Sequence, residues 1–142
     1  MRQRHQERDL QTQVCTYIKR KYPDVVFLSE PSGMYVSIYQ ARLLKAQRSK
    51  HALPDLWIIH PSMHYHGLIL ELKHESKTPF KSDGTLRKDQ HLARQAETLE
   101  LLQERKYWAN FGVGYDDCIK QIDMYMSDRT LEEFFTILST PV

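Results

Sequence analysis

Cysteine is scarce in this sequence, and long hydrophobic runs are absent. The two cysteines, Cys15 and Cys118, lie far apart and match neither a zinc-binding nor a redox spacing, so we expect free, buried thiols. No apolar run approaches the length of a membrane span, and residues 1–8 lack the hydrophobic stretch of a signal peptide. These absences predict a cytoplasmic protein without a membrane partner.

Net charge is also small. The 142 residues carry a formal net charge of +2, which is weak support for a nucleic-acid partner, because such binding depends on clustered rather than total charge. Hydrophobic residues make up 41% of the chain and charged residues 27%, as in ordinary globular proteins. The length allows one domain with a substantial core but not two. We therefore expect residues 1–142 to form a single domain.

Two short apolar runs, residues 54–59 and 67–73, organise the chain. Both are rich in Ile and Leu, and the polar segment between them contains turn residues, which predicts two strands joined by a loop. Side chains alternate along a strand, so Glu71 and Lys73 share one face. Asp55 opens the first run directly after a proline. If the strands pair, Asp55 and Glu71 approach each other at one end of a sheet.

Two converging carboxylates are suited to a hard divalent cation. Lys73 would stand beside that cation, where it could hold a phosphate oxygen or orient a water. A Glu-x-Lys triplet by itself is usually a surface ion pair of little value. Here it lies within a run of Leu and Ile, and Asp55 precedes Glu71 by 16 residues at the head of a second apolar run. This context favours a catalytic site.

The remaining patterns predict an α/β order around this hairpin. Helical spacing of apolar residues indicates helices over about 6–21, 36–46, 87–105 and 116–126, the last one capped by Asp116, and a short C-terminal helix over about 130–139. Further strands are expected over 25–28 and 107–111, with turns at 30–33 and at Gly112 and Gly114.

Three polar residues fall on faces that are expected to point inward. Glu7 shares the apolar face of the first helix, where it is either a first-turn acid stabilised by the helix dipole or a carboxylate that reaches the site; Gln11 follows four residues later. Gln95 lies between Leu92 and Leu99 on the stripe of a later helix, whereas Gln90 lies off it. An inward glutamine needs partners, either backbone groups or the catalytic lysine and a water.

Basic residues flank the acidic pair on both sides in the sequence. Arg48 and Lys50 lie in a loop that leads into Asp55, and Lys77 and Lys81 lie in a polar loop after Lys73. Such side chains could bind a phosphate backbone, although a solvated loop explains them equally well.

These motifs together resemble the VRR-NUC family of the PD-(D/E)XK nuclease superfamily, over residues 7 to about 126. The family has a Glu with a Gln four residues later, a Leu-Lys-Ala segment before Pro-Asp-Leu, a Glu-x-Lys triplet and a Gln seven residues before a Leu. This chain matches these features at Glu7 and Gln11, residues 44–46 and 54–56, Glu71-Leu72-Lys73, and Gln95 and Leu102. It departs from the family at Arg48, Ala52 and Lys106, which stand in place of glycines, so its loop geometry and substrate preference are open.

The resemblance implies a restriction-endonuclease-like core, with a mixed central sheet flanked by helices, and a metal-dependent DNA endonuclease that leaves a 5′-phosphate. Standalone members resemble bacterial or phage proteins that form homodimers and act on branched, Holliday-junction-like DNA. The implied catalytic residues are Asp55, Glu71, Lys73 and Gln95, and Gln11 supports them. Mg²⁺, for which Mn²⁺ could substitute, would bind Asp55, Glu71 and the Leu72 carbonyl, with Glu7 as a further ligand.

Two other functions compete with this hypothesis. One is a DNA-binding or assembly module whose catalytic site is vestigial. The other is a zinc protein that uses His60, His64, His66 and His74, although no cysteine or carboxylate pattern completes a closed zinc site.

The C-terminal region carries apolar residues that suggest a homodimer interface. A small domain has one acidic site, and cutting two strands needs two sites at a fixed separation. The alternative is that these residues close the core of the monomer. The apolar residues of this C-terminal region are Met124, Phe134, Phe135 and Leu138.

Overall fold

A four-stranded mixed sheet forms the centre of the computed structural model, which describes residues 2–31 and 34–127. The strands β1 (Phe27–Ser29), β2 (Leu56–Ile58) and β3 (Leu68–Lys73) are antiparallel neighbours, and β4 (Trp108–Val113) runs parallel to β3. The helices are α1 (Arg2–Lys21), α2 (Ile38–Gln47), α3 (Gln90–Glu104), α4 (Tyr115–Ser127) and the short 3₁₀-helix η1 (Glu75–Lys77). The predicted α/β class with a mixed sheet flanked by helices is confirmed.

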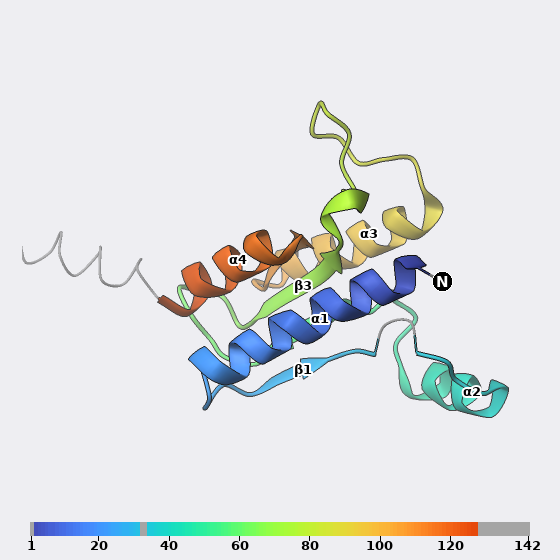
Figure 1. Cartoon of the computed structure of the whole chain (residues 1–142), viewed down its shortest axis with the longest axis horizontal. Helices are drawn as coiled ribbons and strands as arrows, with labels where there is room; N and C mark the ends of the chain where they lie inside the picture. The colour runs from blue at the N-terminus through green and yellow to red at the C-terminus, as the bar shows by residue number, and fades with distance from the viewer. Residues whose placement is uncertain (1, 32–33, 128–142) are drawn as a thin grey trace, which may run out of the picture.

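The alternation of side chains along β3 divides the core into two layers. Leu68, Leu70 and Leu72 are buried in one apolar cluster with residues of α1 and α4, and Ile69 is buried in another with Leu99 of α3. Figure 1 shows α1 and α4 on one side of the sheet and α3 on the other. Glu71 and Lys73 follow Ile69 at steps of two, so they face the α3 side.

Hydrogen bonds to one carboxylate fix α1 against α4. The hydroxyls of Tyr17 and Tyr22 donate to Asp123 at 2.7–2.8 Å, and Lys21 Nζ lies 3.0 Å from the same carboxylate. These contacts bury the apolar face of α1 against α4 and the sheet. They hold the C-terminal end of α1, and the same helix carries Glu7 and Gln11 nearer its N-terminus.

One expected turn residue, Gly112, and one expected helix cap, Asp116, are wrong in detail. Gly112 lies within β4 rather than in a turn, and a Cβ there would come within 2.6 Å of Cys118 Sγ, so close packing accounts for this glycine. Gly114 does form the turn, with φ of +81°. Asp116 does not precede α4 as a cap, because the helix begins at Tyr115 and Asp116 lies in its first turn.

The three positions at which the chain differs from the glycines of the family it resembles have different backbone conformations. Lys106, after the end of α3, has φ of +65°, a left-handed conformation that glycine adopts without strain. Arg48 ends α2 with an ordinary extended φ of −114°, and Ala52 does not have a positive φ. Only Lys106 therefore occupies a conformation that favours glycine.

The helix α2 is separate from the rest of the fold. Ser37 and Gln40 form a reciprocal capping box that satisfies its first turn, but none of its residues is buried. Among the described elements, α2 packs extensively against no other helix or strand. Figure 1 shows it standing apart from the sheet and the other helices.

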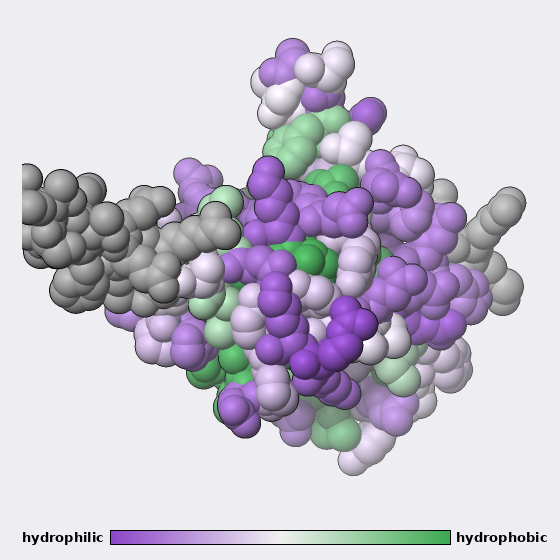
Figure 2. Space-filling model, turned by 60° about the vertical axis from the view of Figure 1, so that its left-hand side comes forward, coloured by the Kyte–Doolittle hydropathy of each residue, from purple (hydrophilic) through white to green (hydrophobic). Residues whose placement is uncertain are grey.

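Residues 79–87 form an arm rather than an irregular loop. An isolated bridge pairs Phe80 with Leu86, the Lys81 backbone N–H donates to the Thr85 carbonyl, and the Asp83 carboxylate accepts from Thr85 at the tip. The Phe80 ring packs edge-on against Phe111 of β4 at 5.7 Å between centroids. Figures 1 and 2 both show the arm projecting from the body of the molecule.

Some predictions fall on residues that the structure does not describe. These are Ser32 and Gly33 of the expected turn, and the expected helix over 130–139 with Phe134, Phe135 and Leu138. Both cysteines are free as expected, but only Cys118 is buried, because Cys15 is half-buried at the rim of the core. In the part of the chain that is described, no helix is both long and apolar enough to cross a bilayer.

Candidate active site

Asp55 and Glu71 meet where the pairing of β2 with β3 ends. Leu56, the first residue of β2, pairs with Leu70 at the end of the β2–β3 pairing. Asp55 therefore lies one residue beyond the paired part of the strand. Its Oδ2 accepts a hydrogen bond from the Leu72 backbone N–H at 2.8 Å. The carboxylate thus takes the place of a missing strand partner and is fixed beside β3.

The same geometry explains why the Leu72 carbonyl suits a ligand. Extending the register by two residues beyond the Leu56–Leu70 pair places Pro54 opposite Leu72, and proline has no N–H to donate. The N–H and C=O of one residue in an antiparallel strand point toward the same neighbour. Because the Leu72 N–H points to Asp55, its carbonyl is directed to the side on which that carboxylate lies.

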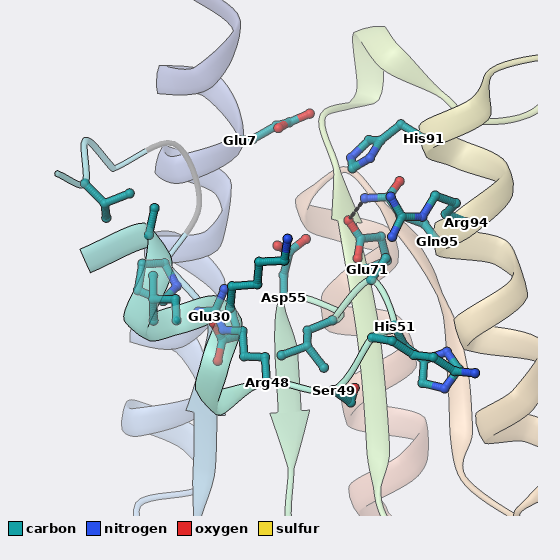
Figure 3. A pocket seen from close by; sticks show the side chains of 18 of the residues that line it. Glu7, Glu30, Arg48, Ser49, His51, Asp55, Glu71, His91, Arg94 and Gln95 are labelled. Carbon is teal, nitrogen blue, oxygen red and sulfur yellow. Dashed lines mark hydrogen bonds and ion pairs between the residues drawn. The ribbon is translucent and has the colours of Figure 1, made fainter. Parts of the chain in front are cut away.

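Glu71 is held by two neighbouring side chains. It is only 4% exposed, and Lys73 Nζ lies 3.7 Å from its Oε1. The Gln95 side-chain amide of α3 donates to the same oxygen (Figure 3). We expected Gln95 to bond to the lysine or to a water; its observed partner is instead the carboxylate.

Gln95 also has an unused acceptor. The residue is 7% exposed, and its Oε1 finds no hydrogen-bond partner among the described residues. A buried carbonyl oxygen without a partner costs free energy of about 1–3 kcal/mol. The position beside Glu71 is therefore suited to a donor such as a water molecule.

The electrostatics of the acidic pair favour an added positive charge. Burial raises the pKa of Asp55 above its ordinary value, and the positive charge of Lys73 opposes that rise without cancelling it. Burial, followed by the negative charge of Asp55, raises the pKa of Glu71. Lys73 thus compensates the pair only in part.

Gln11 fixes the backbone that carries Asp55. Its side-chain amide donates to Ser29 Oγ at 2.6 Å, to the Glu30 carbonyl, and more weakly to the Asp55 carbonyl at 3.4 Å. The Glu30 N–H donates to that Asp55 carbonyl at 2.7 Å. Gln11 therefore joins α1 to the ends of β1 and β2, which is a supporting role.

Glu7 faces the site from α1 but stands apart from the two carboxylates. It lines the same cavity, and its charge contributes to the raised pKa of both Asp55 and Glu71. Within the described ranges, however, no three His, Cys, Asp or Glu side chains gather closely enough to hold a metal. Glu7 thus does not complete a three-carboxylate site in this structure.

A cavity of about 730 Å³ opens over the acidic pair. Asp55, Glu71 and Lys73 form its floor, and α2 with the following loop forms one wall. Figure 3 shows Glu7 approaching it from α1 on one side and Gln95 from α3 on the other. The cavity thus connects the acidic pair with the basic stretch after α2.

The four predicted DNA-binding residues have different surroundings. Lys50 is exposed and lines the cavity, whereas the guanidinium of Arg48, which also lines it, is paired with the Glu30 carboxylate. Lys77 and Lys81 lie in η1 and in the arm and do not line the cavity. Only Lys50 is therefore both at the site and without an ion-pair partner among the described residues.

Three further residues line the cavity; His51 ends the basic loop that was expected to meet phosphate, whereas His91 and Arg94 were not predicted. His51 precedes Asp55 in the chain, and His91 and Arg94 extend from α3 toward the strand that carries Glu71 (Figure 3). His91 precedes the inward Gln95 by one helical turn, so helical spacing could have identified it. Without that spacing, exposed basic residues at the start of a helix cannot be distinguished from ordinary surface residues.

The zinc hypothesis is not supported. His60, His64, His66 and His74 all lie in the described part of the chain, yet they form no cluster that could bind a metal ion. His66 instead packs edge-on against Tyr107, and His74 accepts from the Ser76 N–H at the start of η1.

Comparison with known proteins shows a similarity in fold. No family model matches the sequence, and no curated protein matches it either. A solved structure described as "VRR_NUC domain protein" is similar in fold, with a TM-score of 0.61 and 24% sequence identity. The similarity covers 86% of this chain and 88% of the other, so it spans nearly the whole of both. The chain therefore has the fold of a VRR_NUC domain protein, the family that its sequence resembles.

Proposed function

We propose that this protein is a member of the VRR-NUC family and a metal-dependent DNA endonuclease. The observation that carries the proposal is the pair of the half-buried Asp55 and the buried Glu71, with Lys73 on the same face of β3, at the floor of an open cavity. Two carboxylates that one lysine compensates only in part are costly unless a cation binds. The similarity in fold to a VRR_NUC domain protein supports the same conclusion.

The chemistry of the donor groups fits Mg²⁺. The carboxylates of Asp55 and Glu71 and the carbonyl of Leu72 are hard oxygen ligands, and Mg²⁺ commonly binds one or two protein carboxylates and retains several waters. The unpaired Gln95 Oε1 could accept a hydrogen bond from such a water. When bound, Mg²⁺ supplies Lewis acidity and lowers the pKa of water. Mn²⁺ takes the same ligand types and is expected to substitute.

The chain's own residues then have distinct tasks. Lys73 would neutralise the charge that develops on a non-bridging phosphate oxygen, or orient the attacking water. Gln95 holds the Glu71 carboxylate in one orientation through its amide. Gln11 fixes the Asp55 backbone. Hydrolysis by attack on phosphorus, with the 3′-oxygen as leaving group, would leave a 5′-phosphate.

The proposed substrate is DNA, with branched DNA as the preferred form. The cavity is open and has Lys45 and Lys50 on the wall formed by α2 and its loop. The arm carries Lys81 to one side of the body, where it could bind a second strand. A substrate with diverging strands can contact both features, whereas a straight duplex need not.

A cleavage panel tests this proposal directly. Linear, nicked, flapped and four-way DNA would be incubated with purified protein, with and without Mg²⁺. We expect cleavage only with the metal, fastest on branched DNA, and none from Asp55→Asn or Glu71→Gln. Binding without cleavage under every metal condition would instead support the alternative, a DNA-binding module with a vestigial site.

We also propose that the active form is a homodimer, because two sites at a fixed separation can cut two strands together. Met124 near the end of α4 is 45% exposed, so it could contribute to the interface. Sedimentation at micromolar concentration tests this. A species that remains monomeric on DNA and still cuts both strands together would contradict it.

A further inference from the structure

The segment that leads into α2, together with the first turn of that helix, exposes aromatic side chains that no described element covers. Tyr35 is 94% exposed and Tyr39 is 71% exposed, and Ile38 between them is 76% exposed. A surface helix normally buries its apolar residues against the core. A group of exposed apolar side chains on one element commonly marks a binding surface.

The same segment carries a concentrated positive charge. Between Glu30 and Asp55 the sequence contains four Lys or Arg residues and no Asp or Glu. The other 16 basic residues of the chain are outnumbered by its 18 acidic ones, so this segment accounts for the positive net charge. Charge complementarity therefore favours a polyanion as the occupant. The four residues are Arg42, Lys45, Arg48 and Lys50.

The segment is also next to the catalytic floor. Val36, Ala41, Leu44 and Lys45 line the cavity together with Asp55 and Glu71. A strand whose phosphate reached the acidic pair would thus pass beside α2. Its adjoining nucleotides would come near the exposed tyrosines.

We propose that Tyr35 and Tyr39 form a stacking surface for unpaired bases of the DNA strand that enters the cavity. The proposal rests on the proposed nuclease function and adds unpaired nucleotides to the substrate. Aromatic rings stack on bases of any sequence, and the basic residues along the segment attract the phosphates. A second copy of this chain is a poorer occupant, because two-fold pairing would place the acid-free segment against itself and bring like charges together.

Binding in EDTA, where no cleavage occurs, separates this surface from catalysis. A 2-aminopurine-labelled single strand, a flapped duplex and a blunt duplex would be titrated with wild type, Tyr35→Ala and Tyr39→Ala. We expect each substitution to weaken binding of the single strand and the flap by roughly 5- to 100-fold, as base stacking typically contributes, and to reduce the fluorescence change. Binding of the blunt duplex should change less than about twofold.

Further variants distinguish stacking from apolar contact. Tyr→Phe at both positions should restore binding, whereas Tyr→Leu, which keeps apolar bulk without a ring, should not. Leu43→Ala, an exposed residue of the same helix without a ring, is the matched control and should bind as wild type does. Thermal melting should be unchanged in all variants because neither tyrosine is buried.

The outcomes are distinct. If the alanine or leucine variants bind unpaired DNA as tightly as wild type, the stacking surface is wrong while the nuclease proposal stands. If wild type binds no DNA at all, the proposed function fails as well. If the substitutions leave binding unchanged and dissociate a dimer in sedimentation, the surface belongs to a second copy, which also overturns the proposal.

Discussion

The strand β3 and the helix α2 contain similar proportions of apolar side chains but place them in opposite surroundings. All six residues of β3 are buried, whereas α2 has no buried residue. The strand lies between β2 and β4 with helices on both faces, while α2 depends on its capping box for its first turn. Apolar content alone therefore does not predict burial; the neighbours that the topology supplies decide it.

The charged residues of the two elements differ in the same way. Glu71 and Lys73 are buried and fixed by β3, whereas Arg42 and Lys45 of α2 are exposed. Buried charges cost stability but give a rigid geometry for chemistry. Exposed charges on an isolated helix cost little and remain accessible to a partner. We therefore assign chemistry to β3 and substrate binding to α2.

The largest expected effect contrasts the stability contributed by the two elements. Leu70→Ala, at a fully buried position of β3, should lower the free energy of unfolding by about 2–5 kcal/mol. Ile38→Ala, at an exposed position of α2, should change it by less than about 0.5 kcal/mol. Urea denaturation in EDTA measures both. Similar losses would mean that α2 is packed in solution.

The next effect concerns catalysis. Lys73→Ala should reduce the cleavage rate by about 10²–10³, because it removes a charge-stabilising group at the transition state. Lys19→Ala, an exposed lysine on α1, is the control and should cleave normally. Lys73→Met retains the buried volume and should be equally inactive. Cleavage by folded Lys73→Ala at a near-normal rate would remove Lys73 from the site.

The central residues of the site follow from local patterns. Asp55 and Glu71 are marked by a proline, a hairpin-length gap and an apolar run, and the alternation along β3 places Lys73 beside Glu71. The stripe of α3 places Gln95 inward. These predictions depend only on strand and helix periodicity, which short stretches of sequence contain.

The features that were missed depend on contacts between distant segments. Arg48 pairs with Glu30 18 residues away, which its own loop does not indicate. The isolation of α2 could not be predicted, because its apolar side chains are of the types found in a buried helix. Only the fold shows that none of the described elements packs closely beside it. His91 and Arg94 join the site only through the packing of α3 against β3.

A smaller effect tests the neighbour of Glu71. Gln95→Ala should slow cleavage by about 10- to 100-fold, as is typical when a residue that orients a metal ligand is removed. Gln90→Ala, at the exposed first residue of α3, should cleave as wild type does. Initial rates at saturating Mg²⁺ measure both variants. Equal activity, at equal thermal stability, would exclude the role of Gln95.

The smallest expected effect is a gain in stability from removing the buried charge. Glu71→Gln keeps the shape of the side chain and removes a carboxylate whose pKa burial and Asp55 raise. In the metal-free wild type, the folded state holds this proton more tightly than the unfolded state, so stability falls as the pH rises above the ordinary glutamate pKa of about 4.3. Glu71→Gln has no carboxyl group to titrate at this position, so its stability does not fall with pH for this reason.

The advantage of Glu71→Gln should therefore grow between pH 5 and pH 8 in EDTA and reach at least about 1 kcal/mol, since one pKa unit corresponds to about 1.4 kcal/mol. Glu97→Gln, an exposed glutamate on α3, should show no such gain. Mg²⁺ should stabilise wild type more than Glu71→Gln, because only wild type retains both carboxylates for the cation. A variant that is less stable than wild type in EDTA at pH 8 would show that the buried carboxylate is already compensated without metal.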